Sequence, residues 1–395
     1  MSDPRDPTLA RAPGMDVVRI LDQLIVRALE HNASDIHIEP KDHMVRVRFR
    51  VDGVMLEQRP LPEGLAQQVI SRIKVLGKMD IAERRVPQDG TFTFQAEGIQ
   101  PVAVRASTFP CISGEKAVLR LLLGAKVQGL MDLGASPDQA HVLSRMVQRP
   151  GGLILVTGPT GSGKTSTLYA LLEEVDTDKR NVVTLEDPIE VQLPRITQGQ
   201  IEPKAGFTFA TGLRSILRQD PDVILVGEMR DVETARIAVQ ASLTGHLVLS
   251  TLHTNSAADT MMRLVDMGLE PYVVANALIC VVAQRLVRTL CPACTEPHTT
   301  DPDLLDDIGF QISGLERTLR STGCARCMKS GFKGRTGIFD VVPVDDEIRT
   351  VIKASQTAAD VKRVLAKKGL PTLRRAGVDL VLTGQTTLAE VLRVT

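Results

Sequence analysis

The sequence of 395 residues has no tryptophan, 2 tyrosines and 9 phenylalanines, so aromatic residues make up only 3% of it. Proteins that bind single-stranded nucleic acid stack the bases on aromatic side chains, and this composition argues against that class. Lys plus Arg and Asp plus Glu both number 47, so no net charge draws the chain toward nucleic acid or anionic lipid. Hydrophobic residues make up 43%, which indicates a globular protein with an aliphatic core.

Long apolar runs are also missing. No segment approaches the roughly 18 consecutive apolar residues that a membrane-spanning helix needs, and residues 1–14 are polar and contain proline, unlike a signal peptide. We therefore expect a cytoplasmic protein in which residues 1–15 are disordered. Cysteine is scarce, with 6 residues, and thiols in a reducing compartment do not form disulfides. The chain is longer than one hydrophobic core usually supports, so at least two domains are expected.

Residues 16–124 have the pattern of a mixed helix and strand domain. In residues 45–51 apolar residues alternate with Arg46, Arg48 and Arg50, so the three arginines share one face of a strand. Asp52 and Gly53 then supply a turn. The other expected elements are helices over residues 17–29 and 65–79 and strands over residues 91–95 and 102–107.

The pattern changes at residue 151 to short, almost entirely apolar segments that alternate with helices. Parallel sheets that are buried on both faces have this pattern. The expected strands cover residues 153–157, 182–185, 223–226 and 247–251. A polar cluster follows each strand, and open α/β sheets bind ligands beyond the carboxyl ends of their strands. We expect a linker over residues 125–130 and a second domain over residues 131–395 with one ligand crevice.

Residues 158–165 match the phosphate-binding pattern G-x-x-x-x-G-K-[ST]. The glycines let backbone N–H groups turn toward phosphates, Lys164 can neutralise the terminal phosphates, and Thr165 can hold magnesium. A chance glycine-rich turn is the alternative, but the motif follows a predicted strand and opens a helix expected over residues 166–175. We therefore predict Mg-ATP binding by Gly158, Pro159, Thr160, Gly161, Ser162, Gly163, Lys164, Thr165 and Ser166.

Two glutamates follow predicted strands at the same edge. Hydrolysis needs a carboxylate near magnesium and a group that positions the attacking water, and Glu186 and Glu228 are candidates for these tasks. A helix cap or an arginine partner is the alternative, and it applies most to Asp187 and Glu190. His253 ends a further strand; a structural histidine and a catalytic one remain open at this point.

Four of the six cysteines form two Cys-x-x-Cys pairs with the spacing of a four-thiolate zinc site. We expect a structural zinc, because a closed four-cysteine site leaves no open coordination position, within an insert over residues 288–332. A redox pair is the alternative. The expected ligands are Cys291, Cys294, Cys324 and Cys327, whereas Cys111 and Cys280 are expected in the core.

Arginines concentrate in the first domain. They are either a solvated strand face or groups that reach a phosphate bound by the second domain of the same or a neighbouring subunit. The arginines alone favour the solvated face; the alternating pattern over residues 45–51, with no acidic stripe nearby in the sequence, is the reason to consider the second interpretation. The arginines concerned are Arg46, Arg48, Arg50, Arg84, Arg85, Arg105 and Arg120.

Several segments together resemble the signatures of secretion ATPases. Residues 158–165 resemble their Walker A motif, 185–190 (LEDPIE) the Asp box, 218–222 (RQDPD) with 224–231 (ILVGEMRD) the Walker B region, and 244–255 (TGHLVLSTLHTN) the His box. Residues 34–40 (SDIHIEP), 48–53 (RFRVDG) and 83–90 (ERRVPQDG) resemble the family's first domain. With its tetracysteine insert, the chain is most similar to the type II secretion and type IV pilus assembly ATPases.

The resemblance implies an α/β protein with a PAS-like α+β first domain and a RecA-like P-loop domain that carries the zinc insert. It implies a homohexamer that drives pilin or pseudopilin assembly at the inner membrane through a platform protein and a membrane-anchored cytoplasmic adaptor. Glu186 would activate water, Glu228 would act at magnesium, and Arg50, Arg105 and also Arg48 and Arg85 become candidate arginine fingers. We also expect a short form without the family's additional N-terminal docking domain.

Two other functions are compatible with the motifs. A RecA-like nucleic-acid translocase with a zinc module would share the loop and the cysteines, although zero net charge and few aromatics disfavour direct nucleic-acid binding. A nucleotide-gated scaffold that hydrolyses poorly would share the loop, but the presence of both Glu186 and Glu228 disfavours it.

Overall fold

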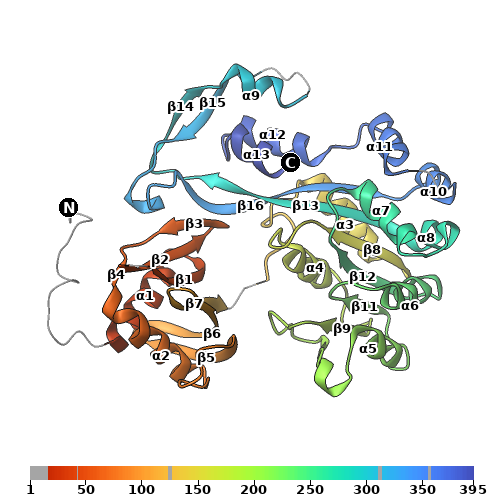
Figure 1. Cartoon of the computed structure of the whole chain (residues 1–395). Helices are drawn as coiled ribbons and strands as arrows, with labels where there is room; N and C mark the ends of the chain where they lie inside the picture. Colours follow the sequence, from red (N-terminus) through yellow and green to blue (C-terminus); the bar gives the residue numbers. More distant parts are fainter. Residues whose placement is uncertain (1–16, 42, 123–126, 310–313, 355–356) are drawn as a thin grey trace. The chain divides into compact units, whose positions relative to one another are not determined.

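The computed structural model describes residues 17–41, 43–122, 127–309, 314–354 and 357–395. The expected disordered segment 1–15 and residues 125–126 of the expected linker lie outside the described residues. The chain divides into two compact units, Met1–Ala125 and Lys126–Thr395 (Figure 1). Among the described residues, no helix is both long and apolar enough to cross a membrane.

The first unit is an antiparallel sheet with the strand order β3-β2-β1-β7-β6-β5, to which β4 adds by pairing with β2. The helices α1 (Val17–Glu30) and α2 (Ala66–Leu76) pack on it against β1 and β7. A short 3-10 helix, Glu63–Leu65, precedes α2. The strands are β1 (Ala33–Lys41), β2 (Met44–Val51), β3 (Val54–Glu57), β4 (Leu61–Pro62), β5 (Gln88–Ala96), β6 (Ile99–Cys111) and β7 (Gly114–Leu122).

Apolar and basic residues alternate along β2, so one face of this sheet points into the core. Val45, Val47 and Phe49 are fully buried, and the helices contribute Leu21 and Ile73 to the same core. The predicted helices and strands of this unit are confirmed with shifts of a few residues at their ends. Its likeness to PAS domains stays a prediction.

The second unit is built on a sheet with the strand order β10-β9-β11-β12-β8-β13-β16. All neighbouring strands are parallel except β13 and β16, which pair antiparallel along most of their length. The strands are β8 (Gly152–Thr157), β9 (Val182–Glu186), β10 (Thr197–Gln200), β11 (Val223–Val226), β12 (Leu247–Leu252), β13 (Leu278–Leu290) and β16 (Phe332–Pro343). The four strands predicted from apolar runs are confirmed as β8, β9, β11 and β12.

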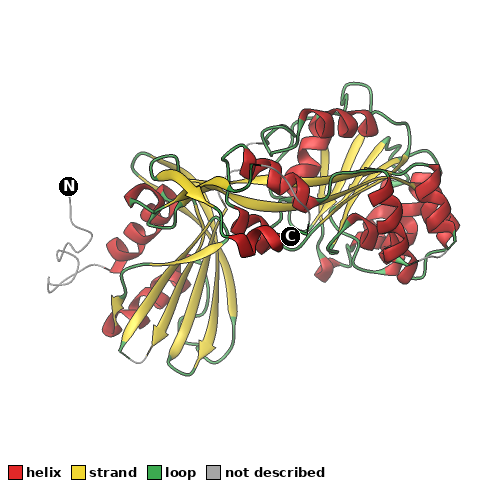
Figure 2. Cartoon of the chain, turned by 90° about the horizontal axis from the view of Figure 1, so that it is seen from above, coloured by secondary structure: helices red, strands yellow, loops and turns green. Residues whose placement is uncertain are grey.

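Helices cover both faces of this sheet (Figure 2). Successive residues of a strand point to opposite faces, so Leu153 and Leu155 of β8 pack with α5, α6, α7 and α8, whereas Ile154 and Val156 pack with α3 and α4. The helices are α3 (Pro137–Val147), α4 (Lys164–Glu173), α5 (Phe209–Ile216), α6 (Val232–Leu243), α7 (Ala257–Asp266), α8 (Pro271–Ala277), α10 (Asp346–Lys353), α11 (Ala358–Lys367), α12 (Leu373–Leu382) and α13 (Leu388–Val394). A 3-10 helix, Pro203–Ala205, precedes α5.

The segment between β13 and β16 leaves the sheet and returns to it. It contains the small antiparallel sheet of β14 (Thr295–Thr299) and β15 (Arg317–Ser321), the helix α9 (Pro302–Asp306) and the 3-10 helix Ala325–Cys327. Leu290 of β13 pairs with Phe332 of β16, and the next residue, Cys291, donates its backbone N–H to the carbonyl of Gly331. The cysteines therefore lie where β13 and β16 separate.

Candidate nucleotide and metal sites

The glycine-rich loop, residues 158–165, connects β8 to α4. Its backbone requires glycine at two places. A Cβ on Gly158, which has φ +153°, would lie 2.5 Å from the Ser162 hydroxyl oxygen, and a Cβ on Gly163, which has φ +88°, would lie 2.8 Å from Nε2 of Gln284. Gly163 caps the N-terminus of α4, so the first N–H groups of this helix open toward the loop. Such a helix start favours bound anions.

The Lys164 ammonium group lies over the same loop. It donates to the carbonyl oxygens of Gly158 at 2.9 Å and Pro159 at 3.0 Å. Burial lowers the pKa of Lys164; the charge of Arg285 lowers it further, and the charge of Glu228 opposes these effects. The lysine therefore has neutral carbonyl partners that an anion can replace.

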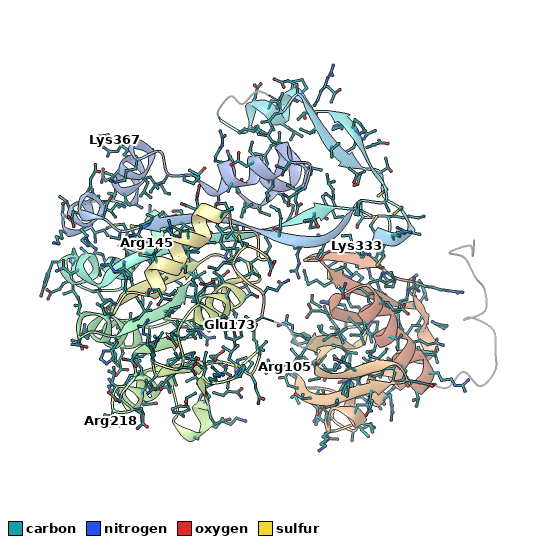
Figure 3. All side chains as sticks on the ribbon, turned by 180° about the vertical axis from the view of Figure 1, so that it is seen from behind. Arg105, Arg145, Glu173, Arg218, Lys333 and Lys367 are labelled. Carbon is teal, nitrogen blue, oxygen red and sulfur yellow. The ribbon has the colours of Figure 1, made fainter. Side chains whose placement is uncertain are left out.

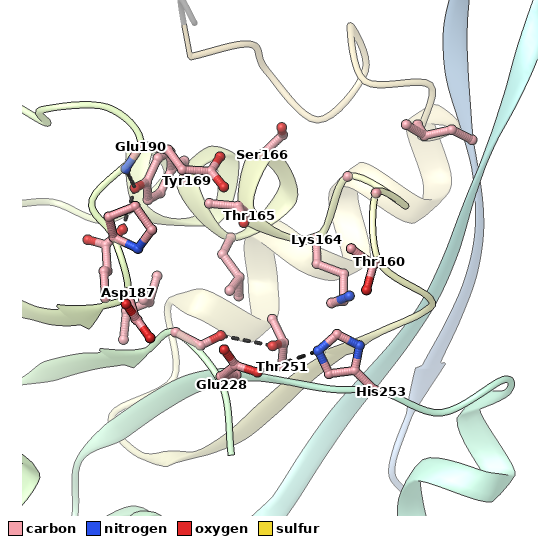
Figure 4. Close-up of a pocket in the computed structure, with 18 of the residues that line it drawn as sticks. Thr160, Lys164, Thr165, Ser166, Tyr169, Asp187, Glu190, Glu228, Thr251 and His253 are labelled. Atoms are coloured by element: carbon pink, nitrogen blue, oxygen red, sulfur yellow. Dashed lines mark hydrogen bonds and ion pairs between the residues drawn. The ribbon is translucent and has the colours of Figure 1, made fainter. Parts of the chain in front are cut away.

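Glu228 is the second residue after β11, following Gly227, and it lies across the pocket from Lys164 (Figure 4). Its carboxylate pairs with the guanidinium of Arg230 and lies 3.5 Å from Nε2 of His253. Burial alone would raise the pKa of Glu228, but the hydrogen bond and charge of Arg230 and the nearby His253 lower it below the usual glutamate value. This glutamate is therefore an anion whose charge acts on Lys164.

Glu186 is the last residue of β9 and has an exposed fraction of only 3%. Its Oε1 atom accepts hydrogen bonds from the Thr184 hydroxyl at 2.6 Å and from Nε2 of Gln198 at 3.0 Å. Its Oε2 atom accepts a hydrogen bond from the Tyr169 hydroxyl. A buried carboxylate is costly without such donors, and here three side chains supply them.

These groups line one pocket of about 400 Å³ (Figure 4). The loop residues, both glutamates and His253 come from four separate chain segments, as the strand ends predict. Thr165 and Ser166 of α4 lie on its wall together with Thr251 of β12. Asp187 lies 3.8 Å from Arg230, and the backbone N–H of Glu190 donates to the Tyr169 hydroxyl.

The donor set of this pocket fits a nucleoside triphosphate with magnesium. The hydroxyl oxygen of Ser162 is buried inside the glycine-rich loop and has no hydrogen-bond partner among the described residues. It can therefore form a hydrogen bond with a ligand bound in the loop. Thr165 and Glu228 supply a hydroxyl and a carboxylate, which are ligands that magnesium prefers. Magnesium held there would neutralise charge on the phosphates.

The four predicted cysteine ligands form one cluster in which all sulfur atoms lie within 4.8 Å of one another. The Sγ atoms of Cys291 and Cys324 are 3.9 Å apart, and those of Cys294 and Cys327 are also 3.9 Å apart. Sulfurs bound at about 2.3 Å to a tetrahedral zinc are separated by about 3.8 Å. The backbone N–H groups of Cys324 and Gly331 donate to the Cys327 sulfur and, against the effect of burial, lower the pKa of that thiol to about 7.

The arginines of the first unit differ from expectation in their partners. Sheet pairing places carboxylates of β1 and β3 beside the arginine face of β2, although no acidic stripe is nearby in the sequence. The pairs are Arg46 with Glu57, Arg48 with Glu39, and both Arg50 and Arg120 with Asp35, at 3.8 and 2.9 Å for the last two. These acidic residues lie on other strands than the arginines, and only the pairing of the strands brings them together.

Arg105 differs from these arginines. It lies on β6 directly opposite Arg120 of β7, and among the described residues it has no ion pair. Arg105, Arg120, Asp35 and Arg50 thus follow one another across four strands, with three cations and one anion. This row retains positive charge on an exposed face of the sheet.

Two findings were not predicted. Cys111, expected in the core, is exposed because it lies at the tip of the hairpin that joins β6 to β7, whereas Cys280 is buried as expected. The partners of Glu186 were also missed, because Tyr169 and Gln198 are far from it in sequence. Tyr169 could have been found from its position five residues after Lys164 on a helix that starts at the phosphate loop.

An open parallel sheet with a glycine-rich loop between its first strand and the following helix is typical of P-loop nucleotide-hydrolysing proteins. The chain matches the model of the family "Type II/IV secretion system protein" over residues 12–393. It is 47% identical over 380 residues to the type II secretion system protein E of Aeromonas hydrophila. The match covers 96% of this chain and 75% of that protein.

Other relatives extend this result. The type IV pilus assembly ATPase PilB of Thermus thermophilus is 45% identical over 377 residues, covering 95% of this chain and 42% of that protein. The solved structure of the pilus retraction motor PilT with bound ADP has a TM-score of 0.60 and 28% identity, and the match covers 95% of this chain and 96% of that one. The chain therefore belongs to the type II/IV secretion system protein family, and it is an ATPase of the type II secretion and type IV pilus group.

The cysteine cluster predicts one bound zinc per chain. Metal analysis of freshly reduced protein should find one equivalent in the unmodified chain and in the control variant Cys111→Ser, whose cysteine is exposed and outside the cluster. Cys291→Ser combined with Cys324→Ser should lose the metal, and chelation should loosen the segment between β13 and β16 while nucleotide binding remains. Zinc-free reduced protein would contradict this site.

Proposed function

We propose that this ATPase hydrolyses Mg-ATP as a homohexamer and uses the energy to assemble pilins or pseudopilins in a type II secretion or type IV pilus-like system. The observation that carries the proposal is the joining of the glycine-rich loop, Glu186 and Glu228 in one pocket. The names of the relatives support the choice of system, because they are assigned to type II secretion and type IV pilus assembly. ADP in the PilT structure supports an adenine nucleotide as the substrate.

The chemical roles follow from where each group lies. Lys164 exchanges its two loop carbonyls for the terminal phosphates, and Thr165 with Glu228 holds magnesium. Glu186 accepts the proton of the attacking water, and His253 orients Glu228, which lies 3.5 Å from its imidazole. In this assignment the carboxylate at magnesium and the base that accepts the proton of water are two separate residues.

In this proposal the first unit adds positive charge to the nucleotide site. The row of Arg105, Arg120, Asp35 and Arg50 has more cations than anions, and charge that develops on transferring phosphates is stabilised by arginine. We propose that Arg50 and Arg105 reach a nucleotide in the same or a neighbouring subunit. The first unit, which we propose to be PAS-like, then acts as a donor of arginine fingers.

The proposed location is the cytoplasmic side of the inner membrane. The motor would be held there by a membrane platform protein and a membrane-anchored cytoplasmic adaptor, and it would not contact nucleic acid. Equal numbers of acidic and basic residues support attachment through protein partners instead of anionic lipid.

Lys164→Ala should abolish productive ATP binding, because no other side chain of the loop carries a positive charge. The matched control is Lys367→Ala on α11, an exposed lysine far along the chain from the loop (Figure 3). Titration with ATP and magnesium should show binding in the control and a loss of at least about 100-fold in affinity in the variant. Equal affinity in both would refute the site.

Glu186→Gln should keep nucleotide binding and lose hydrolysis, because an amide cannot accept the proton of water. Glu228→Gln should instead raise the magnesium concentration that half-maximal turnover requires. The two variants are compared by turnover at increasing magnesium concentrations with saturating ATP. Near-normal turnover of Glu186→Gln together with an inactive Glu228→Gln would show that the two roles are exchanged.

Arg105→Ala should lower turnover far more than nucleotide affinity, because an arginine finger acts on charge that forms in the transition state. Arg145→Ala on α3 serves as the control for losing an exposed arginine (Figure 3). Turnover per chain of the unmodified protein should also rise with protein concentration as subunits associate. If Arg105→Ala and Arg50→Ala both match the control, these arginines are a solvated face of the sheet.

A further inference from the structure

The Tyr169 hydroxyl connects two parts of the nucleotide site. It donates to Oε2 of Glu186 and accepts the backbone N–H of Glu190 at 3.3 Å (Figure 4). The tyrosine has an exposed fraction of 3%, so its side chain is almost completely buried. The side chain thus joins the carboxylate to the loop that follows β9.

Tyr169 also belongs to the helix that binds the phosphates. The helix α4 begins at Lys164, and Tyr169 lies in its second turn, where its neighbours are buried. A helix is a stiff element, so its start at the phosphates and its second turn at Glu186 keep a fixed separation. Among the described residues, the hydrogen bond from Tyr169 is the only one that joins a side chain of α4 to the Glu186 carboxylate.

The other two donors lie on the opposite side of the carboxylate. Thr184 belongs to the same strand as Glu186, and Gln198 belongs to β10, the neighbouring strand. Gln198 is itself fixed, because it accepts the backbone N–H of Leu193 at 2.7 Å and donates to the carbonyl of Val191 at 3.1 Å. These two residues attach Glu186 to the sheet, whereas Tyr169 attaches it to the phosphate-binding helix.

We propose that Tyr169 is a positioning residue for ATP hydrolysis, whose hydroxyl fixes the Glu186 carboxylate relative to the helix that begins at Lys164. The inference rests on the proposed role of Glu186 as the group that activates water. Activation of water requires the base within hydrogen-bond reach of it, and an error of about 1 Å in such a geometry costs about 100-fold in rate. Burial and the hydrogen bond to the Glu186 carboxylate raise the pKa of Tyr169, so its hydroxyl keeps the proton that it donates to Glu186.

The test uses the single-atom change Tyr169→Phe, which removes the hydroxyl and keeps the ring. The control is Tyr272→Phe on α8, the same change at the other tyrosine of the chain, which is exposed. Both variants should bind one nucleotide per chain, with affinities within about twofold of the unmodified protein. Turnover per bound nucleotide should fall at least about tenfold in Tyr169→Phe and stay unchanged in Tyr272→Phe.

Counting bound nucleotide separates positioning from folding. A merely structural role would reduce the fraction of chains that bind nucleotide, and turnover per bound nucleotide would then stay normal. That result would overturn the inference, as would normal turnover with full binding.

A spectroscopic measurement tests the hydrogen bond directly. The chain has no tryptophan, so Tyr272→Phe leaves Tyr169 as its only tyrosine. A carboxylate polarises a phenol O–H more strongly than an amide does, so adding Glu186→Gln to Tyr272→Phe should shift the tyrosine absorption band to shorter wavelength. An unchanged band would mean that the two side chains are not bonded in solution.

The outcomes also distinguish this inference from the proposed function. An inactive Glu186→Gln with a fully active Tyr169→Phe would reject the positioning role and leave the role of Glu186 standing. A fully active Glu186→Gln would reject both.

Discussion

The edge where β8, β9, β11 and β12 end is the constraint on which the rest of the nucleotide site depends. Because these strands are parallel and adjacent, their carboxyl ends lie side by side. Glu186 is the last residue of its strand, and the glycine-rich loop, Glu228 and His253 come just after the ends of theirs. Their meeting in one pocket therefore results from strand order and not from any contact between the side chains themselves.

The cations Lys164 and Arg285 at the glycine-rich loop are hydrogen-bonded to neutral carbonyls that a ligand can replace. Lys164 donates to two loop carbonyls, and the buried Arg285 donates to the carbonyls of Gln284 and Asn255. A buried polar group without a partner is costly, so these carbonyls keep the cations satisfied when no phosphate is bound. Glu186 is held differently, because its three donors come from side chains that belong to the scaffold. Lys164 and Arg285 are thus bonded to backbone carbonyls, whereas Glu186 is bonded to side chains of the surrounding helix and strands.

Local sequence predicted the parts of the fold that depend on local pattern. Apolar runs gave four strands of the second sheet, and the cysteine spacing gave a cluster whose sulfur atoms lie close together. Pairing between distant segments was not predictable in the same way. The carboxylate partners of Arg48 and Arg50 depend on the register of β1 against β2, and the bond between Tyr169 and Glu186 depends on how α4 packs on the sheet. Cys111 was misplaced because apolar neighbours in sequence do not reveal that a residue lies at a hairpin tip.

The most direct test of this account is an experimental structure with magnesium and a non-hydrolysable ATP analogue. The account predicts that the Lys164 ammonium leaves the carbonyls of Gly158 and Pro159 and contacts the terminal phosphate, while Glu186 keeps its hydrogen bond to Tyr169. Magnesium should lie between Thr165 and Glu228. Phosphates bound away from the glycine-rich loop, or a Lys164 that still bonds both loop carbonyls with the analogue in place, would contradict it.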